Sequence, residues 1–258
     1  MSGYKVSNKC TVLPGQETLV ASWSTLAQLS PGARLIRSPA AVAAVFPSWE
    51  PLNNAIMLNA PGGAAAADAR SQLASAYAAA GVDWWALWMP SCATDLDAPD
   101  DVREVDGMKR DTTTLVMRAD LRPGLREHGG VVRASIPAAT RAAGDEPVRV
   151  TDLGDPESAA GLTAWVMIQE GAAVAGSWSF LHESDCGIYA VGTLPEWRRR
   201  GLARALMEHV LADAQRRGAR TATLQSTRIA QPLYESLGFE PVGRYEEWVS
   251  RAAVSRPA

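Results

Sequence analysis

The alternation of hydrophobic and polar positions is most regular in the second half of this chain. Runs of β-branched residues bounded by turn residues predict strands, and apolar residues spaced at i and i+4 predict helices. Strands are expected at 148–153, 162–169, 172–181, 186–193 and 220–225, followed by a strand pair at 239–249. Helices are expected at 201–217 and 230–237, and each is followed by a glycine, Gly218 or Gly238, that can end it.

The first half has the same kinds of element in a less regular pattern. We expect helices at 17–29 and 64–80 and strands at 33–37, 54–58, 82–89, 111–118 and 131–136. A loop with Pro47, Trp49 and Pro51 separates the first two of these strands, and its tryptophan is a candidate for lining a cavity. The strand at 82–89 holds three tryptophans, which favour a packed sheet core over an aromatic box for a planar or cationic ligand. They are Trp84, Trp85 and Trp88.

The stretch 142–147, which is polar and contains breaker residues, is the best candidate for a linker. We therefore predict two domains, 1–143 and 147–258, each with strands and helices in α/β order around a mixed (α+β) sheet. A chain of 258 residues, 47 % of them hydrophobic, is long enough for two cores of ordinary size.

Charge and cysteine content exclude several classes of partner. A formal net charge of −3 gives no general attraction to nucleic acid or to membranes, so any anion must bind through a local cluster. No apolar run is long enough for a signal peptide or a membrane span, and we expect a cytoplasmic protein. Cys10, Cys92 and Cys186 have no paired spacing, so we expect neither a disulfide framework nor a zinc site.

The stretch 191–206, V-G-T-L-P-E-W-R-R-R-G-L-A-R-A-L, has the pattern of a strand, a turn and a helix that hold a phosphate. The first N–H groups of a helix have no partner within it, and the helix dipole adds partial positive charge there. Small residues such as Gly201 and Ala203 let a diphosphate approach the backbone, and Arg198, Arg199 and Arg200 add charge.

The spacing Arg198-x-x-Gly201-x-Ala203 resembles the Arg/Gln-x-x-Gly-x-Gly/Ala signature of the GCN5-related N-acetyltransferase (GNAT) family. A second segment, L-Y-E-S-L-G-F at 233–239, is similar to the L-Y-x-x-L-G-F segment that follows the fifth strand in that family. The resemblance implies a domain that binds acetyl-CoA or another acyl-CoA. The implied cofactor-binding residues are Val191, Thr193, Arg198, Arg199, Arg200, Gly201, Leu202, Ala203 and Arg204.

The first half has no counterpart of the arginine-rich turn, so it resembles a degenerate acetyltransferase-like repeat in a tandem protein. The stretch 148–162 leaves room for little more than one helical turn where the family has two helices that help to form the acceptor site. Either the first half supplies that wall, or the acceptor pocket is unusually open.

The reaction implied by the resemblance is direct attack of an amine on the thioester. Tyr234 lies where the family has a residue near the thioester sulfur. A phenol of pKa about 10 can protonate a leaving thiolate whose pKa is about 8.5. A backbone N–H in 190–192 is the candidate for binding the oxyanion. The candidates for the general base, at the mouth of the fourth strand, are Glu183, Asp185 and His182, although such loop acids are more often solvated turn residues.

The acceptor is therefore expected to be an amine of a small molecule or a peptide. Two alternatives stay open: an aminoacyl-tRNA donor on the same fold, which the acidic composition disfavours, and a non-catalytic module that binds CoA or another ligand. Nucleic acid is a partner only under the first alternative, no membrane is expected, and the protein is expected to be a monomer or a homodimer.

Overall fold

The computed structural model describes residues 12–58, 64–98, 105, 107–122, 124–144, 146–156 and 159–250, without the side chains of 64–67. The α-helices are α1 (Gln16–Leu29), α2 (Ala64–Ala79), α3 (Ile136–Gly144), α4 (Leu202–Arg216) and α5 (Gln231–Glu235). The strands are β1 (Arg34–Arg37), β2 (Ala41–Val45), β3 (Asn54–Met57), β4 (Ala86–Ser91), β5 (Met108–Asp120), β6 (Val131–Ala134), β7 (Val148–Arg149), β8 (Leu162–Gln169), β9 (Ala172–His182), β10 (Asp185–Thr193), β11 (Thr221–Ser226) and β12 (Glu240–Ser250).

The two halves of the chain repeat one order of strands and helices. In the N-terminal half β1, β2 and β3 are antiparallel neighbours, and α2 then connects β3 to β4, which lies parallel to it. In the C-terminal half β8, β9 and β10 are antiparallel neighbours, and α4 connects β10 to the parallel β11. This repeated order confirms the prediction of an α/β chain with two related halves around a mixed sheet.

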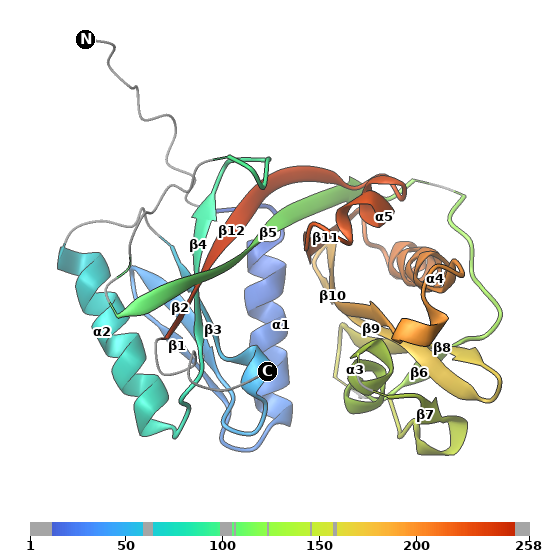
Figure 1. Ribbon diagram of the computed structural model, residues 1–258, viewed down its shortest axis with the longest axis horizontal. Coiled ribbons are helices and arrows are strands. Elements are labelled where there is room, and N and C mark those ends of the chain that lie inside the picture. The colour runs from blue at the N-terminus through green and yellow to red at the C-terminus, as the bar shows by residue number, and fades with distance from the viewer. Residues whose placement is uncertain are drawn as a thin grey trace, which may run out of the picture.

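One long strand of each half lies beside a strand of the other half. β12, from the end of the chain, pairs with β4, and β5, from the first half, pairs with β11. Because β5 and β12 also pair with each other, all the strands of the described residues join in one 12-stranded sheet. Figure 1 shows these two long strands crossing from one half to the other above α1.

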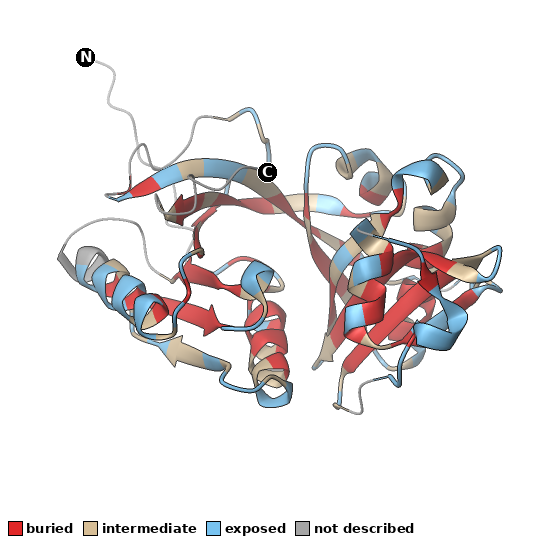
Figure 2. Ribbon diagram, turned by 60° about the horizontal axis from the view of Figure 1, so that its bottom comes forward, coloured by how far each residue is buried: buried red, intermediate tan, exposed pale blue. Residues whose placement is uncertain are grey.

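Helices α1 and α3 cover the face of the C-terminal sheet opposite to α4. α1 packs against β1 and β2 of its own half and also against β9 and β10, whereas α3 packs against β8, β9 and β10. Alternate residues of β8 show the two faces: Ala164 and Val166 belong to the core under α1 and α3, and Trp165 and Met167 to the core under α4. Buried residues run through the strands of both halves and along α1 (Figure 2).

The division of the chain between residues 143 and 147 stays a prediction. β6 pairs with β8, and α3 lies on the C-terminal sheet, although both precede residue 147.

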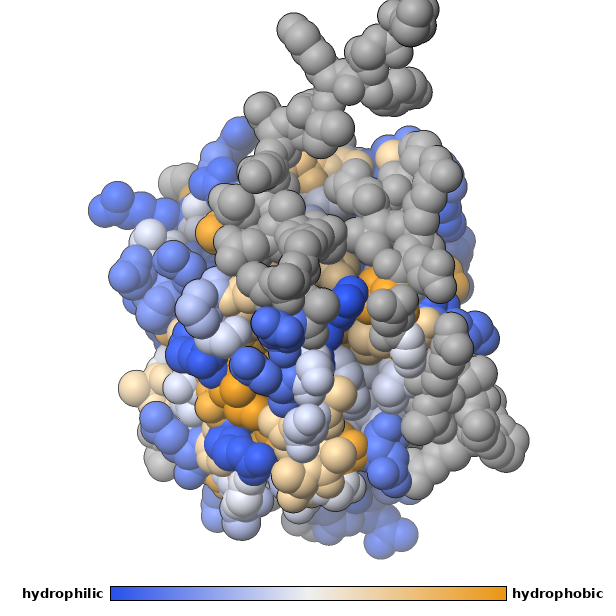
Figure 3. Space-filling view, turned by 90° about the vertical axis from the view of Figure 1, so that its left-hand side faces the viewer, coloured by the Kyte–Doolittle hydropathy of each residue, from blue (hydrophilic) through white to orange (hydrophobic). Residues whose placement is uncertain are grey.

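The N-terminal half ends in edge strand β1, whose exposed ends are Arg34 and Arg37, and charge at an edge opposes pairing with another chain. On the side of this half that faces the viewer in Figure 3, hydrophilic side chains surround a smaller hydrophobic patch.

Most expected elements are present, and the differences have local causes. β2 was expected to be loop, because its five residues, A-V-A-A-V, are buried on both faces and so show no alternation. α3 was also missed, because its sequence, I-P-A-A-T-R-A-A-G, contains a proline and ends at the expected linker. The expected strand at 148–153 is only β7 followed by a 3-10 helix at Val150–Asp152. The strand pair expected at 239–249 is the single strand β12.

Two further expectations concern the whole chain. Within the described residues, no helix is long and apolar enough to cross a membrane. Cys186 is a free buried thiol, whereas Cys92 is disulfide-bonded, a bond that the cysteine spacing did not predict.

Candidate functional site

The parallel strands β10 and β11 separate partway along their length. Their ladder runs from Asp185, opposite Thr221, to Ile188, opposite Leu224, and goes no further. On the other side, the pairing of β10 with β9 skips from Tyr189 to Gly192. Ala190, in the gap, has a φ of 51°. Residues 190 and 191 are thus in neither ladder, so β10 is splayed and bulged in the stretch that holds the candidate N–H for the oxyanion.

The turn after β10 leads into α4 through a left-handed residue. Gly201 caps the helix with φ 79° and ψ 1°, a conformation that suits glycine. Among the described residues, no acceptor bonds the backbone N–H groups of 199–204, and the first bond of the helix runs from Ala205 N to Gly201 O at 3.0 Å. A row of unpaired N–H groups at a helix start attracts an anion.

A small pocket of about 270 Å³ opens at this helix start. It collects most of the residues that the sequence assigned to the cofactor: Thr193, Arg198, Arg199, Gly201, Leu202, Ala203 and Arg204. Val191 and Arg200 are not in its lining, while Trp197 and Leu233, which the sequence did not assign to the cofactor, are. Trp197 lies in the 3-10 turn Pro195–Trp197, and the proline that opens this turn was the available sequence signal.

The arginines of the turn differ in their contacts and exposure. Arg198 Nε donates to the Thr193 carbonyl at 2.9 Å, which ties the turn to the end of β10. Arg199 is exposed and left-handed, with φ 63°. Arg200 lies over the ring of Trp197 at 4.7 Å and donates to the Glu196 carbonyl at 2.9 Å. Positive charge therefore surrounds the pocket on several sides.

Arg204 closes the far side of the same pocket. Its guanidinium donates to the Ser236 hydroxyl at 2.6 Å, just after α5, and lies 3.4 Å from Glu208. The start of α4 is thereby linked to the end of α5.

Tyr234 is buried between α4 and the strands. It is 4 % exposed and belongs to the same apolar core as Ile188 and Leu224, the last paired residues of the parallel ladder. Its ring packs edge-on against Phe239, and burial raises the pKa of its phenol to about 12. Its hydroxyl bonds to no described residue, and the phenol is fully protonated at neutral pH.

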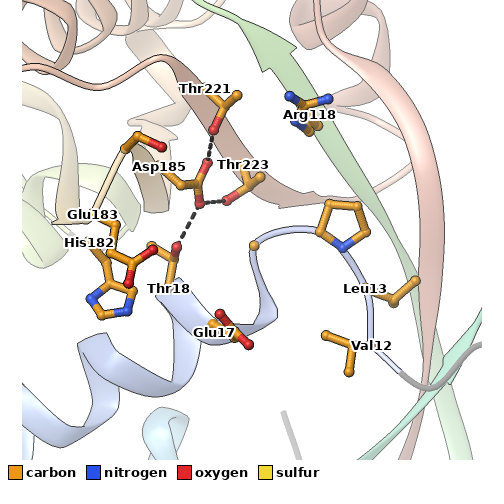
Figure 4. A pocket seen from close by; sticks show the side chains of 13 residues that line it. Val12, Leu13, Glu17, Thr18, Arg118, His182, Glu183, Asp185, Thr221 and Thr223 are labelled. Carbon is orange, nitrogen blue, oxygen red and sulfur yellow. Dashed lines mark hydrogen bonds between the residues drawn. The ribbon is translucent and has the colours of Figure 1, made fainter.

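Glu183 and Asp185 lie at the other end of β10. Thr193 comes eight positions after Asp185, which is about 26 Å at the rise of a β-strand. Both acids line a separate cavity of about 410 Å³ with Glu17, His182 and Arg118 (Figure 4). The structure therefore does not bring these acids to the turn that Arg198 and Gly201 form.

The carboxylate of Asp185 is bonded by three hydroxyl groups. They belong to Thr18 at 2.7 Å, Thr221 at 2.7 Å and Thr223 at 2.8 Å (Figure 4). These donors come from α1 and β11, so Asp185 joins the two halves of the molecule. The geometry gives this residue a structural function, and it does not support one as a general base.

Other polar groups of this half are less reactive than their residue types suggest. Burial raises the pKa of the Cys186 thiol to about 12, which disfavours the thiolate. His209 is buried; its ring packs against Trp165, and its Nδ1 accepts from His128 N at 3.1 Å. Burial lowers the pKa of His209.

The tryptophans of the N-terminal half divide into packed and cavity-lining groups. Trp85 stacks on Tyr77 at 4.7 Å, and Trp88 packs between Trp23 and Tyr245. These contacts favour the packed core over an aromatic box. Trp49, in contrast, lines an apolar pocket, as expected of its loop.

The wall that stretch 148–162 is too short to form comes from earlier in the chain. α1 and α3 occupy the face of β8, β9 and β10 that those residues would otherwise leave open. These contacts favour the alternative in which the first half of the chain supplies the wall.

Comparison with known proteins agrees with this arrangement. Residues 160–241 match the family model of the acetyltransferase (GNAT) domain. The [ribosomal protein bS18]-alanine N-acetyltransferase of Escherichia coli is 38 % identical over 58 residues, which are 21 % of this chain and 39 % of that protein. This chain thus spans about two fifths of the length of the curated relatives that it matches.

Solved structures show the same fold over nearly the whole chain. A GCN5-related N-acetyltransferase from Kribbella flavida has a TM-score of 0.60 at 19 % identity, covering 90 % of this chain and 95 % of that one. A GCN5-related N-acetyltransferase-like protein from Streptococcus suis has a TM-score of 0.54 at 14 % identity, covering 92 % and 94 %. The chain therefore has a fold similar to that of GCN5-related N-acetyltransferases over most of its length, and its residues 160–241 resemble the acetyltransferase (GNAT) domain.

Proposed function

We propose that this protein is an N-acyltransferase that moves an acetyl or other acyl group from acyl-CoA to an amine of a small molecule or a peptide. The observation that carries this proposal is the row of unpaired N–H groups at 199–204, which lies directly after the splayed strand β10. The N–H groups would bind the diphosphate of CoA, and Arg198 and Arg199 would add charge. The bound acyl-CoA would supply the thioester as the electrophile.

The residues of the chain would then serve the transfer in two places. The bulge at 190–191 would offer backbone N–H groups to the oxyanion. Tyr234, buried and protonated, would donate a proton to the leaving thiolate. Because three hydroxyls bond Asp185, and Glu183 lies beside it, neither acid is part of this proposal.

Calorimetry with CoA tests the donor site. We expect Arg198→Ala/Arg199→Ala to weaken CoA binding at least about tenfold, since charge-assisted hydrogen bonds contribute about 1.5–3 kcal/mol each. Arg216→Ala is the control, because Arg216 is an exposed arginine at the opposite end of the same helix. A wild-type protein that bound no CoA at millimolar concentration would refute the proposed donor.

A thiol-release assay over a panel of amines tests the transfer itself. The panel includes a peptide that begins with alanine, because the Escherichia coli relative is an alanine N-acetyltransferase. Binding of CoA without release on any amine would favour a non-catalytic CoA-binding module. A gel shift with aminoacyl-tRNA tests the other alternative, and cell fractionation tests the expected cytoplasmic location.

A further inference from the structure

An apolar pocket of about 370 Å³ lies between α1, the N-terminal sheet and α3. It is formed by the end of α1, the loop from β2 to β3 and the first turns of α3. None of the described residues that line it is charged. Its walls are mainly rings and aliphatic side chains: Leu29, Pro31, Phe46, Pro47, Trp49 and Pro137. Leu29, at the rim, is 47 % exposed, although it is a large hydrophobic side chain.

The pocket is level with the bulge in β10, because α1 runs beside that strand in the same direction. Thr18 bonds to Asp185 at the start of both elements, and further along Ser22 lies next to Tyr189. From Thr18 to Leu29 the helix advances about 16 Å. From Asp185 to Ala190 the strand advances about the same distance. The end of α1, and the pocket beyond it, therefore lie at the height of Ala190.

Helix α3 sets the distance between the pocket and the bulge. It crosses β9 and β10 in direct backbone contact: a Cβ on Gly176 would lie 1.9 Å from the Ala139 carbonyl oxygen, and one on Gly192 would lie 1.9 Å from that of Ala143. Thr140, in the pocket wall, is three residues from Ala143. One helical turn and one strand spacing together separate the pocket from the splayed strands by about 10 Å.

We propose that this pocket receives an uncharged aromatic group of the acceptor, so that the preferred substrates are amines with an aromatic ring roughly 10 Å from the nitrogen. The inference rests on the proposed acyl transfer, because it uses the bulge in β10 as the point of reaction. Pockets of this size that consist of apolar and aromatic side chains bind apolar ligand groups. Trp49 and Phe46 would pack against the ring.

A series of phenylalkylamines of increasing chain length, each paired with an alkylamine of equal length, tests the preference. Burying a ring of this size is worth about 1.5–3 kcal/mol. We therefore expect a KM about 10- to 100-fold lower for the aromatic member of a pair, largest for the longer spacers. Saturation-transfer NMR measures binding of the same amines in the absence of CoA, and this measurement does not depend on turnover.

Substitutions locate the binding. Trp49→Ala and Leu29→Ala should each weaken binding of the aromatic amine and raise its KM, about tenfold for Trp49→Ala, with the KM for acyl-CoA unchanged. Trp84→Ala is the matched control, because Trp84 is a half-buried tryptophan of the same half that does not line the pocket. Leu29→Ala keeps the test informative if Trp49→Ala fails to fold.

The outcomes separate this inference from the proposed function. Binding that depends on Trp49, without transfer to any amine, would support the pocket and refute the acyltransferase. Transfer without aromatic preference, unaffected by Trp49→Ala and Leu29→Ala, would overturn the pocket and leave the acyltransferase in place. If the wild type has the molecular mass of a dimer in solution and Trp49→Ala that of a monomer, with no change in amine binding, a second copy of the chain covers the pocket. This result would also overturn the inference.

Discussion

The Thr18 hydroxyl on α1 donates a 2.7 Å hydrogen bond to the Asp185 carboxylate on β10. This bond joins the first helix of the chain to the strand that ends in the proposed CoA site. Thr221 and Thr223, on β11, bond the same carboxylate. The start of the parallel pair is thereby held together, while its other end is splayed.

Replacement of Asp185 should therefore lower stability more than it lowers activity. Because Asp185→Ala leaves three hydroxyls without their acceptor, we expect it to lower the free energy of unfolding by about 2–4 kcal/mol, and Thr18→Val by about 1 kcal/mol. Urea unfolding measures both. A kcat that fell 100-fold in Asp185→Asn, with the protein fully folded, would instead favour a direct function in proton transfer.

The contact between Gly192 and α3 predicts an effect of a single methyl group. Gly192→Ala places a Cβ 1.9 Å from the Ala143 oxygen, so α3 must shift, and we expect a loss of about 3 kcal/mol in stability. A Cβ at Gly144, the last residue of α3, would meet no atom within 4 Å, so Gly144→Ala should be neutral or slightly stabilising. Thermal unfolding of the two variants compares them; equal melting temperatures would contradict the observed packing.

The proposed acid predicts a selective loss of rate. Tyr234→Phe should lower kcat at least about tenfold, because general acids contribute about 10²–10⁴. Since the pKa of Tyr234 is raised to about 12, the rate that it supports should persist above pH 10 in the wild type. Tyr77→Phe is the control: its hydroxyl bonds only to the Ala44 carbonyl among described residues, far from the thioester site, and kcat should not change. An unchanged alkaline rate in Tyr234→Phe would rule out this function of the phenol.

Glu247 predicts that stability falls as the pH rises toward neutrality. Burial, together with the nearby Asp111, raises the pKa of Glu247 from 4.5 to about 7, against the opposing bond from Trp88. Between these values the folded state holds a proton that the unfolded state has released, so the free energy of unfolding decreases with increasing pH across this window. The total is at most about 3 kcal/mol. Urea unfolding from pH 4 to 8 should show this slope in the wild type and a flatter one in Glu247→Gln.

Replacement of Asp111 separates the two causes of that shift. Asp111→Asn removes one of the groups that raise the pKa of Glu247. The pH range over which the free energy of unfolding decreases should therefore end at a lower pH than in the wild type. An identical slope in wild type, Glu247→Gln and Asp111→Asn would show that other groups control it.

The sequence by itself determined the parts of this protein that depend on neighbours in the chain. The turn 191–206 could be predicted because a strand, a glycine cap and a helix start are all short-range features. The hairpin around Glu170 and Gly171 could also be predicted, because only two residues, one of them glycine, separate two strand patterns. In the structure both residues have a positive φ. Most of the residues that gather around Gly201 could be assigned from the sequence, because they lie within one short stretch of the chain, 193–204.

Only the tertiary structure decided what depends on contacts between distant residues. The sequence did not predict that β5 and β12 pair with strands of the opposite halves, because the sequence of a strand alone does not show which strand it pairs with. β2 is buried on both faces, which removes the alternation that would have predicted it. Thr18, 167 residues away, bonds Asp185, and a carboxylate at the start of a strand has the same local sequence pattern whether it catalyses or joins two elements. The proposed acceptor pocket likewise exists only where α1, the Trp49 loop and α3 meet.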